Sequence, residues 1–184
     1  MSVEIPGYVA GTWVIDPVHS EVSFTVRHMM VSKVRGRFDK FEGTIVTAED
    51  PLASTVTASV DLDSINTNQE QRDAHIRSAD FFEVEKYPTM TFTSTAVKAA
   101  EEGFVLEGDL TLKGVTKAVA FNLEVNGIGP DAYGGTRIGF SAETQIHRSD
   151  FNVNFNGPIP GVPGGVAVSE NVTINLEIEG VLQA

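Results

Sequence analysis

Apolar and polar side chains alternate almost without error in Asn171-Val172-Thr173-Ile174-Asn175-Leu176-Glu177-Ile178-Glu179-Gly180. A period of two places the apolar side chains on one face of a β-strand and the polar ones on the other. The same alternation returns in residues 22–26, 56–62, 104–112, 119–125 and 138–146. At least six such strands, with almost no helix between them, have to close around a common apolar interior.

Short connections join most of these segments, so neighbouring strands are expected to be antiparallel. We predict strands in residues 13–16, 21–28, 36–47, 55–62, 89–95, 103–112, 117–126, 136–147 and 171–180, and a glycine-rich loop over residues 127–135. About eight antiparallel strands form either a sandwich or a barrel. Large inward side chains such as Phe24, Phe92 and Phe140 alternate with small ones such as Gly108 and Ala142. A sandwich would use that mixture to fill a core, and a barrel would use it to leave room for one small ligand.

One connection, over residues 62–90, is too long for a hairpin and contains the one expected helix. Thr67 and Glu70 have the spacing of a capping box, which predicts a short helix over residues 69–79. Phe81 and Phe82 follow it. A structured excursion between short turns is typical of a binding element. We expect residues 73–82 to cover one end of the barrel, with Phe81 and Phe82 pointing into it.

Composition limits the classes of function. The 184 residues predict a single domain over 1–184, with a core at 12–180. A net charge of −12 argues against nucleic-acid binding and against stable membrane insertion at anionic lipid. Zero cysteines exclude disulfides and thiolate metal sites. The first residues lack the pattern of a secretory signal, so we expect a cytoplasmic protein.

The basic residues are concentrated in residues 27–40, which hold Arg27, Lys33, Arg35, Arg37 and Lys40. One interpretation is a solvated strand edge on which basic side chains discourage aggregation. The other is a rim that binds an anionic headgroup. A dimer interface would explain the same residues, because arginine and methionine are enriched at interfaces.

Motifs for catalysis are absent: the chain has no phosphate-binding glycine loop, dinucleotide fingerprint or serine nucleophile elbow. His19, His28, His75 and His147 lie too far apart in sequence to suggest a metal site. We therefore predict no catalytic residues, no metal and no cofactor. The positions of Asp16, Asp73 and Arg148 leave open whether they converge at one barrel end.

Four separated segments resemble the YceI-like family of lipocalin-like polyisoprenoid-binding proteins. They are Trp13-Val14-Ile15-Asp16-Pro17-Val18-His19-Ser20, residues 73–82 with Tyr87-Pro88, residues 108–116, and Arg148-Ser149-Asp150-Phe151. The resemblance covers residues 12–180. It implies an all-β fold, a lipocalin-like antiparallel barrel of about eight strands with one short helix in a long crossover. It also implies a tunnel for a long isoprenoid chain, such as a polyprenyl or quinone tail, usually in a homodimer, and binding rather than catalysis.

Two sets of residues are expected to hold this ligand. The expected tunnel lining consists of Phe24, Val26, Phe81, Phe82, Phe92, Leu106, Leu110, Phe121, Leu123, Phe140 and Ile174. The expected rim for the headgroup consists of Arg27, His28, Met29, Met30, Arg35 and Arg37. Two alternatives stay open: an enzyme for a hydrophobic substrate with His19, His28, His75 and Arg148 around the cavity, and a structural barrel whose interior is filled by side chains.

Overall fold

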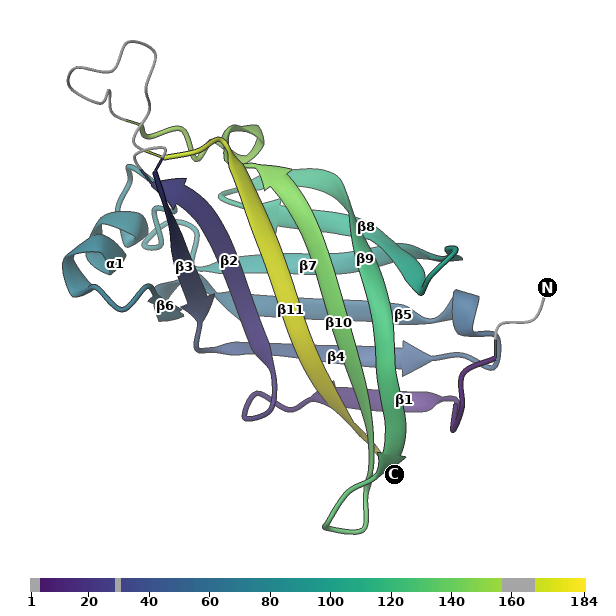
Figure 1. Ribbon diagram of the computed structural model, residues 1–184. Coiled ribbons are helices and arrows are strands. Elements are labelled where there is room, and N and C mark those ends of the chain that lie inside the picture. The colour runs from purple at the N-terminus through teal and green to yellow at the C-terminus, as the bar shows by residue number, and fades with distance from the viewer. Residues whose placement is uncertain (1–3, 29–30, 157–167) are drawn as a thin grey trace.

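The computed structural model describes residues 4–28, 31–156 and 168–184. They form a twisted, tilted barrel with one α-helix at one end (Figure 1). The strands are β1 (Gly11–Ile15), β2 (Glu21–His28), β3 (Ser32–Phe38), β4 (Phe41–Thr47), β5 (Thr55–Asp61), β6 (Ile65–Asn66), β7 (Thr89–Ala99), β8 (Phe104–Leu112), β9 (Val115–Pro130), β10 (Thr136–His147) and β11 (Asn171–Leu182). The helix is α1 (Glu70–Arg77), and three 3-10 turns are η1 (Pro51–Ala53), η2 (Leu62–Ser64) and η3 (Arg148–Phe151).

Every ladder between these strands is antiparallel. The order is β1-β4-β5-β7-β8-β9-β10-β11, and β11 pairs with β1 to close the barrel. A path around the barrel therefore crosses eight strands. At three of these eight places the wall is made by two strands that follow each other along the barrel axis. Towards the helix end β2 replaces β1, β3 replaces β4 and β6 replaces β5, since β11 pairs with β2, β2 with β3, and β3 with β6. The predicted antiparallel barrel of about eight strands is confirmed.

Two predicted boundaries were wrong. The strand expected over residues 36–47 divides at Asp39 and Lys40, where the chain changes from the partners of β3 to those of β4. The glycine-rich loop expected from residue 127 begins only after Pro130, because residues 127–130 continue β9 by pairing with residues 136–139 of β10. In both cases pairing with distant strands overrides the local composition.

The start of α1 also differs from the prediction. Its N-cap is Gln69, whose side-chain oxygen accepts from the backbone N–H of Arg72 at 2.6 Å. Asn68 has a φ of 63°, so the chain turns away between Thr67 and the helix. Thr67 is buried and donates its backbone N–H to Asp73 at 2.9 Å, and its hydroxyl bonds the same carboxylate. Thr67 therefore anchors the helix through Asp73 instead of forming the predicted capping box with Glu70.

A buried cluster lies at the barrel end opposite α1. Trp13 is fully buried against Ile15, Ile45 and Ile138. Its indole N–H donates to the hydroxyl of Thr47 at 2.8 Å, and that hydroxyl donates in turn to the carbonyl of Val9. Any opening into the interior is therefore expected at the helix end. Within the described residues no helix has the length and apolar character needed to cross a membrane.

Candidate ligand-binding site

The middle of the barrel contains an inner cavity of about 130 Å³. Residues of nine strands line it, mostly every second residue along each strand, as the period of two predicts. Its aromatic residues are Phe41, Phe92, Phe121 and Phe140, and the rings of Phe92 and Phe121 meet edge to face with centroids 5.5 Å apart. The aliphatic lining comprises Ile15, Val22, Ile45, Val56, Ala58, Val60, Met90, Leu106, Leu110, Leu123, Ala142, Ile174, Leu176 and Ile178. The barrel is therefore hollow here, and the filled-barrel alternative does not describe it.

Glycines on neighbouring strands help to keep the interior open. Gly36 pairs with Phe24 across β3 and β2, and a Cβ on Gly36 would lie 2.3 Å from Cζ of that ring. A Cβ on Gly108 would lie 2.4 Å from Cζ of Phe92. Because glycine has no side chain, each ring can lie against the wall of the barrel instead of crossing the interior. The small residues expected on inward positions, such as Gly108, thus provide space for the large ones, such as Phe92.

A larger outer cavity of about 440 Å³ lies at the helix end. α1 contributes Gln71, Arg72, His75 and Ile76 to its lining, its N-cap contributes Gln69, and the crossover adds Phe81 and Phe82. Most of the other lining residues come from β2, β3, β7, β8, β10, β11 and the segment from η3 onward, including Phe24, Val26, Val34, Phe38, Met90, Leu112, Ile146, Val153, Phe155, Val172 and Ile174. The prediction that the helix and the two phenylalanines cover one end of the barrel agrees with this arrangement.

The charged side chains that line the outer cavity are arginines, and histidine, serine, threonine and glutamine supply the rest of its polar lining. Arg27, His28, Arg72, His75 and Arg148 line it, and its described lining contains no aspartate or glutamate. That is notable in a chain with 25 acidic residues. The Arg72 guanidinium donates to the hydroxyl and the carbonyl of Thr67, at 2.8 and 2.7 Å, rather than to a carboxylate. We call the part of the outer cavity bordered by Arg27, His28, Arg72, His75 and Arg148 the mouth. It combines the positive charge of the arginines with apolar walls.

Arg148 is the buried cation of this group, with 5% of its surface exposed. Its guanidinium donates to the carbonyls of Ser169, Val153, Phe155 and Val168 at 2.9, 2.8, 2.8 and 3.3 Å. Burial lowers the pKa of Arg148, and the nearby Glu170 carboxylate partly opposes that effect. The contacts tie the chain after η3 to the chain before β11, so Arg148 fixes one side of the mouth.

Three rings close part of the mouth. His75 meets Phe155 with ring centroids 4.9 Å apart and Phe81 at 5.1 Å, and Phe81 lies 5.3 Å from Phe155. Nε2 of His75 is 2.8 Å from a carboxylate oxygen of Asp80. The cluster joins α1 to the segment that Arg148 holds, which makes the mouth a defined structure rather than a gap between loops.

The eleven expected tunnel residues all line one of the two cavities. Phe24, Val26, Phe81 and Phe82 face the outer cavity, Ile174 faces both, and Phe92, Leu106, Leu110, Phe121, Leu123 and Phe140 face the inner one. Their contact with a ligand stays a prediction. The sequence analysis missed Arg72, Met90 and Phe155. The only signal for Arg72 was its place in the expected helix, one turn before His75 and Ile76, which line the same cavity.

The expected rim is only partly at the mouth. Arg27 and His28 line the outer cavity. Arg35 and Arg37 are exposed on the outer face of β3, since they alternate with the inward Gly36 and Phe38, and Arg37 pairs with Asp39 at 2.9 Å. Met29 and Met30 lie outside the described residues. Alternation along β3 thus places Arg35 and Arg37 on the outer face of the barrel, although Gly36 and Phe38 beside them in sequence face inward.

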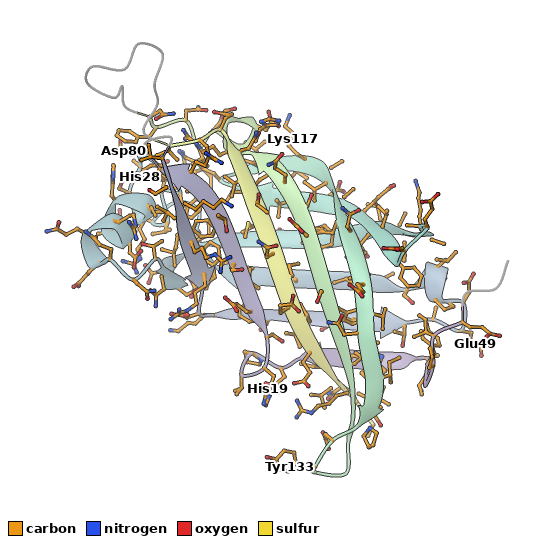
Figure 2. All side chains as sticks on the ribbon, viewed as in Figure 1. His19, His28, Glu49, Asp80, Lys117 and Tyr133 are labelled. Atoms are coloured by element: carbon orange, nitrogen blue, oxygen red, sulfur yellow. The ribbon has the colours of Figure 1, made fainter. Side chains whose placement is uncertain are left out.

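The residues named for an enzymatic alternative do not assemble as one group. His28, His75 and Arg148 line the outer cavity, but His19 lies near the opposite end of the barrel (Figure 2). There its ring nitrogen is 2.7 Å from Asp16, so Asp16 is likewise remote from Asp73 and Arg148. The hydrogen bonds from His19 and from Arg137 hold the pKa of Asp16 at about 2. Asp16, His19 and Glu179 have oxygen and nitrogen atoms close enough for a metal, yet Arg137 already contacts both carboxylates, at 2.7 and 3.3 Å.

With this geometry in hand, comparison with known proteins identifies the family. The model of the YceI-like domain matches residues 13–180. The chain belongs to the YceI-like family. Protein YceI of Escherichia coli O17:K52:H18 is 40% identical over 167 residues, which cover 90% of this chain and 83% of that protein. Protein YceI of Salmonella newport is 39% identical over the same shares of the two chains.

Solved structures share the fold. Burkholderia cenocepacia BcnA superposes with a TM-score of 0.77 and 23% identity, covering 90% of this chain and 98% of that one. The Campylobacter jejuni YceI protein gives 0.73 and 28%, covering 86% and 90%. A domain from Saccharophagus degradans described as polyisoprenoid-binding gives 0.71 and 19%, covering 95% and 100%. The YceI-like barrel is thus common to proteins of quite different sequence.

Proposed function

We propose that this YceI-like protein binds a long-chain isoprenoid lipid, of the polyprenyl or isoprenoid-quinone type, and carries, stores or sequesters it unchanged. The tail would occupy the two cavities and the polar head would lie at the mouth. The observation that carries the proposal is the pair of adjoining apolar cavities reached through a cationic mouth. The polyisoprenoid-binding description of the Saccharophagus degradans domain supports it, because the two barrels share one fold.

The cavity volumes suit a flexible chain. A dry cavity of about 150 Å³ lined by Leu, Ile and Phe accepts a benzene molecule, which has about six carbons. On that scale the 440 Å³ outer cavity holds roughly three isoprene units, or about fifteen carbons. Burying one carbon of the chain contributes about 0.8 kcal/mol, so fifteen carbons contribute a binding free energy of roughly 12 kcal/mol. The cost of association, about 4 kcal/mol or more, is subtracted from this value. Micromolar binding, near −8 kcal/mol, therefore needs no covalent chemistry.

The charge at the mouth favours an anionic head, such as a phosphate or pyrophosphate, over a neutral quinone. Arg27, Arg72 and Arg148 lie on the cavity without a carboxylate among its described lining residues. A guanidinium presents several donors in a fixed plane that suits phosphate oxygens. Arg72 spends two donors on Thr67 and retains others for a ligand. We therefore propose His28 of the expected rim, together with Arg72, for the headgroup in place of Arg35 and Arg37. Arg27 borders the cavity, but its partner in the ladder of β2 and β3 is Lys33, so its side chain shares the outer face of Arg35 and Arg37.

The test compares farnesyl pyrophosphate with farnesol, measured by isothermal titration calorimetry on the purified protein. Arg72→Gln should weaken pyrophosphate binding by about five- to tenfold, equivalent to roughly 1–1.4 kcal/mol, and farnesol binding by much less. Arg35→Gln is the matched control, since Arg35 is exposed on the outer wall. Equal losses for both ligands in Arg72→Gln would remove the headgroup role, and no binding of either would remove the proposal.

Organic extraction of the purified protein, followed by mass spectrometry, tests the same proposal without an added ligand. A co-purifying isoprenoid that is recovered unchanged after incubation supports binding. Conversion of that lipid, abolished in His75→Ala, would support the enzymatic alternative. The homodimer and the cytoplasmic location stay predictions, to be measured by light scattering and by cell fractionation.

A further inference from the structure

Three side chains line both cavities: Val22 of β2, Met90 of β7 and Ile174 of β11. They mark the level at which the inner and outer cavities meet. They are the residues common to the described linings of the two cavities, so the cavities join at one level of the barrel. Val60 and Leu110, which are 8% and 4% exposed, line the inner cavity and belong to the same buried cluster as Val22.

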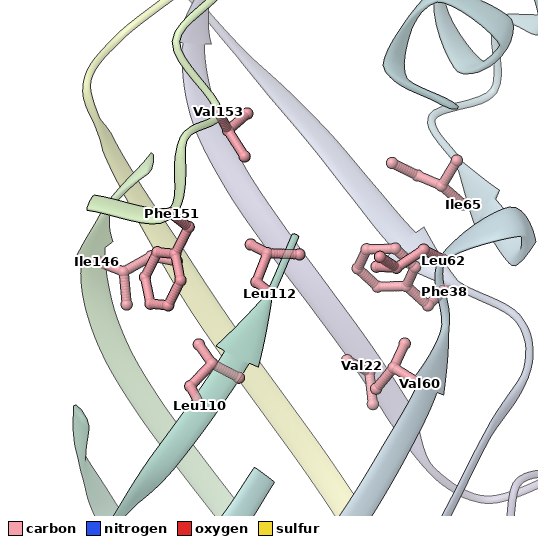
Figure 3. Packing of buried hydrophobic residues seen from close by; sticks show 10 residues of the cluster. All are labelled: Val22, Phe38, Val60, Leu62, Ile65, Leu110, Leu112, Ile146, Phe151 and Val153. Carbon is pink, nitrogen blue, oxygen red and sulfur yellow. The ribbon is translucent and has the colours of Figure 1, made fainter. Parts of the chain in front are cut away.

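The residues at this level approach from opposite sides. β7 and β11 are four positions apart in a closed wall of eight, so Met90 and Ile174 face each other across the interior. Val22 lies beside Ile174, because β2 pairs with β11 through Val22–Leu176 and Phe24–Ile174. Val60 lies beside Met90, its partner in the ladder of β5 and β7. Figure 3 shows Val22, Val60 and Leu110 within one buried cluster, and Met90 and Ile174 pack against it.

We infer that this ring of Val22, Met90 and Ile174, here called the constriction, sets the length of isoprenoid chain that the protein prefers. The inference rests on the proposed function. The outer cavity takes roughly three isoprene units and the 130 Å³ inner cavity roughly one more, on the scale of one benzene per 150 Å³. A fifteen-carbon tail fits without disturbing the constriction, whereas a twenty-carbon tail has to pass it.

Met90 is the adjustable member of the constriction. Valine and isoleucine branch at Cβ and have restricted χ1 angles, so Val22 and Ile174 are stiff. Methionine is unbranched, with three rotatable side-chain bonds, and adapts to irregular spaces. A rotation of Met90 can therefore open the passage while the strands stay paired. A chain that enters the inner cavity gains burial there and offsets the cost of moving Met90.

The experiment measures the affinities of geranyl, farnesyl and geranylgeranyl pyrophosphate, with ten, fifteen and twenty carbons, by titration calorimetry. The decisive quantity is the ratio of twenty-carbon to fifteen-carbon affinity. Met90→Ala should raise that ratio about tenfold, which corresponds to roughly 1.4 kcal/mol. Ala142→Leu, which adds three carbons to a residue that lines only the inner cavity, should lower it about tenfold. Thr93→Ala, exposed on the outer face of β7, is the control and should leave it unchanged.

The outcomes separate this inference from the proposed function. If the wild-type protein binds none of the three ligands, the proposed function fails. If it binds them, but Met90→Ala and Ala142→Leu change all three affinities by the same factor, the constriction does not set chain length. Thermal unfolding of each variant identifies a general loss of structure, and the two substitutions are expected to move the ratio in opposite directions, which unfolding alone would not do.

Discussion

Replacing Arg148 by methionine tests whether one buried cation holds the mouth of the barrel together. Methionine keeps an unbranched apolar stem and removes every hydrogen-bond donor. Four backbone carbonyls, of Val153, Phe155, Val168 and Ser169, would lose their partner. Val153 is only 4% exposed, so its carbonyl has little access to water. The other three belong to partly or fully exposed residues and are better able to bind water instead.

A hydrogen bond to a charged donor contributes about 1.5–3 kcal/mol, and an unsatisfied buried acceptor costs about 1–3 kcal/mol. Counting the Val153 carbonyl in full and the solvated ones in small part gives a loss of about 2–3 kcal/mol in the free energy of unfolding. In a chain of this length, that loss lowers the Tm by roughly 5–10 °C. Urea titration followed by circular dichroism, together with differential scanning calorimetry, measures both quantities.

Two further variants make the result interpretable. Arg35→Met is the same change at an exposed position of β3, and should alter the free energy of unfolding by no more than about 0.5 kcal/mol. Arg148→Lys keeps the charge but offers a single nitrogen, which cannot serve four carbonyls in a planar fan, so it should recover only part of the loss. The reasoning is refuted if Arg148→Met is as stable as the wild type, or if Arg148→Lys is fully stable.

Three other predictions concern the wall and the closed end. Gly36→Ala should lower the free energy of unfolding by about 1–3 kcal/mol, because the new Cβ would overlap the Phe24 ring. Gly127→Ala is the control and should not lower it, because a Cβ there meets nothing within 4 Å. Equal effects of the two substitutions in a urea titration would contradict the wall-packing argument. Asp16 has a folded pKa of about 2, below its ordinary 3.8, so its charge stabilises the fold above about pH 4 and that stability is lost as the pH falls towards 2. Asp16→Asn should therefore flatten the free energy of unfolding in that pH window, and an unchanged profile would count against the ion pair. Thr47→Val removes the acceptor of the buried Trp13 N–H and should cost about 1–3 kcal/mol, with a shifted tryptophan emission as the second readout; wild-type stability would mean that water replaces the hydroxyl.

The inward-facing residues of the barrel could be predicted from sequence because the strand period is strictly local. Phe92, Leu106, Phe121 and Phe140 occupy the inward positions that the period of two assigns, and each lines the interior in the structure. The same rule, carried along β3, would have placed Arg35 and Arg37 outside, on the face opposite Gly36 and Phe38. Grouping basic residues by proximity in sequence obscured that parity.

Features that depend on which strands meet were decided only by the tertiary structure. The chain leaves the sheet at Asp39 and Lys40 because β3, before them, pairs with β2, whereas β4, after them, pairs with β5. Residues 127–130 extend β9 because β10 pairs with them. Asn68 adopts a positive φ, so Thr67 bonds Asp73 instead of capping the helix. In the two strands, pairing between residues distant in sequence outweighs a local preference, which is worth a fraction of a kcal/mol to about 1 kcal/mol. At Thr67, a bond to a carboxylate six residues later replaces the cap.

The sequence by itself determined that antiparallel strands enclose an apolar interior, since alternation fixes which side chains turn inward. The alternation left a sandwich and a barrel open, and the resemblance to the YceI-like family implied the barrel. It did not determine that the interior is hollow, that its two cavities meet at Met90 and Ile174, or that Arg72 and Arg148 line one mouth while His19 lies near the opposite end. Those properties follow from barrel closure and strand register. Both are set by pairings between residues far apart in the chain, such as Ile15 with Gly180, and no local pattern encodes the distance across the interior.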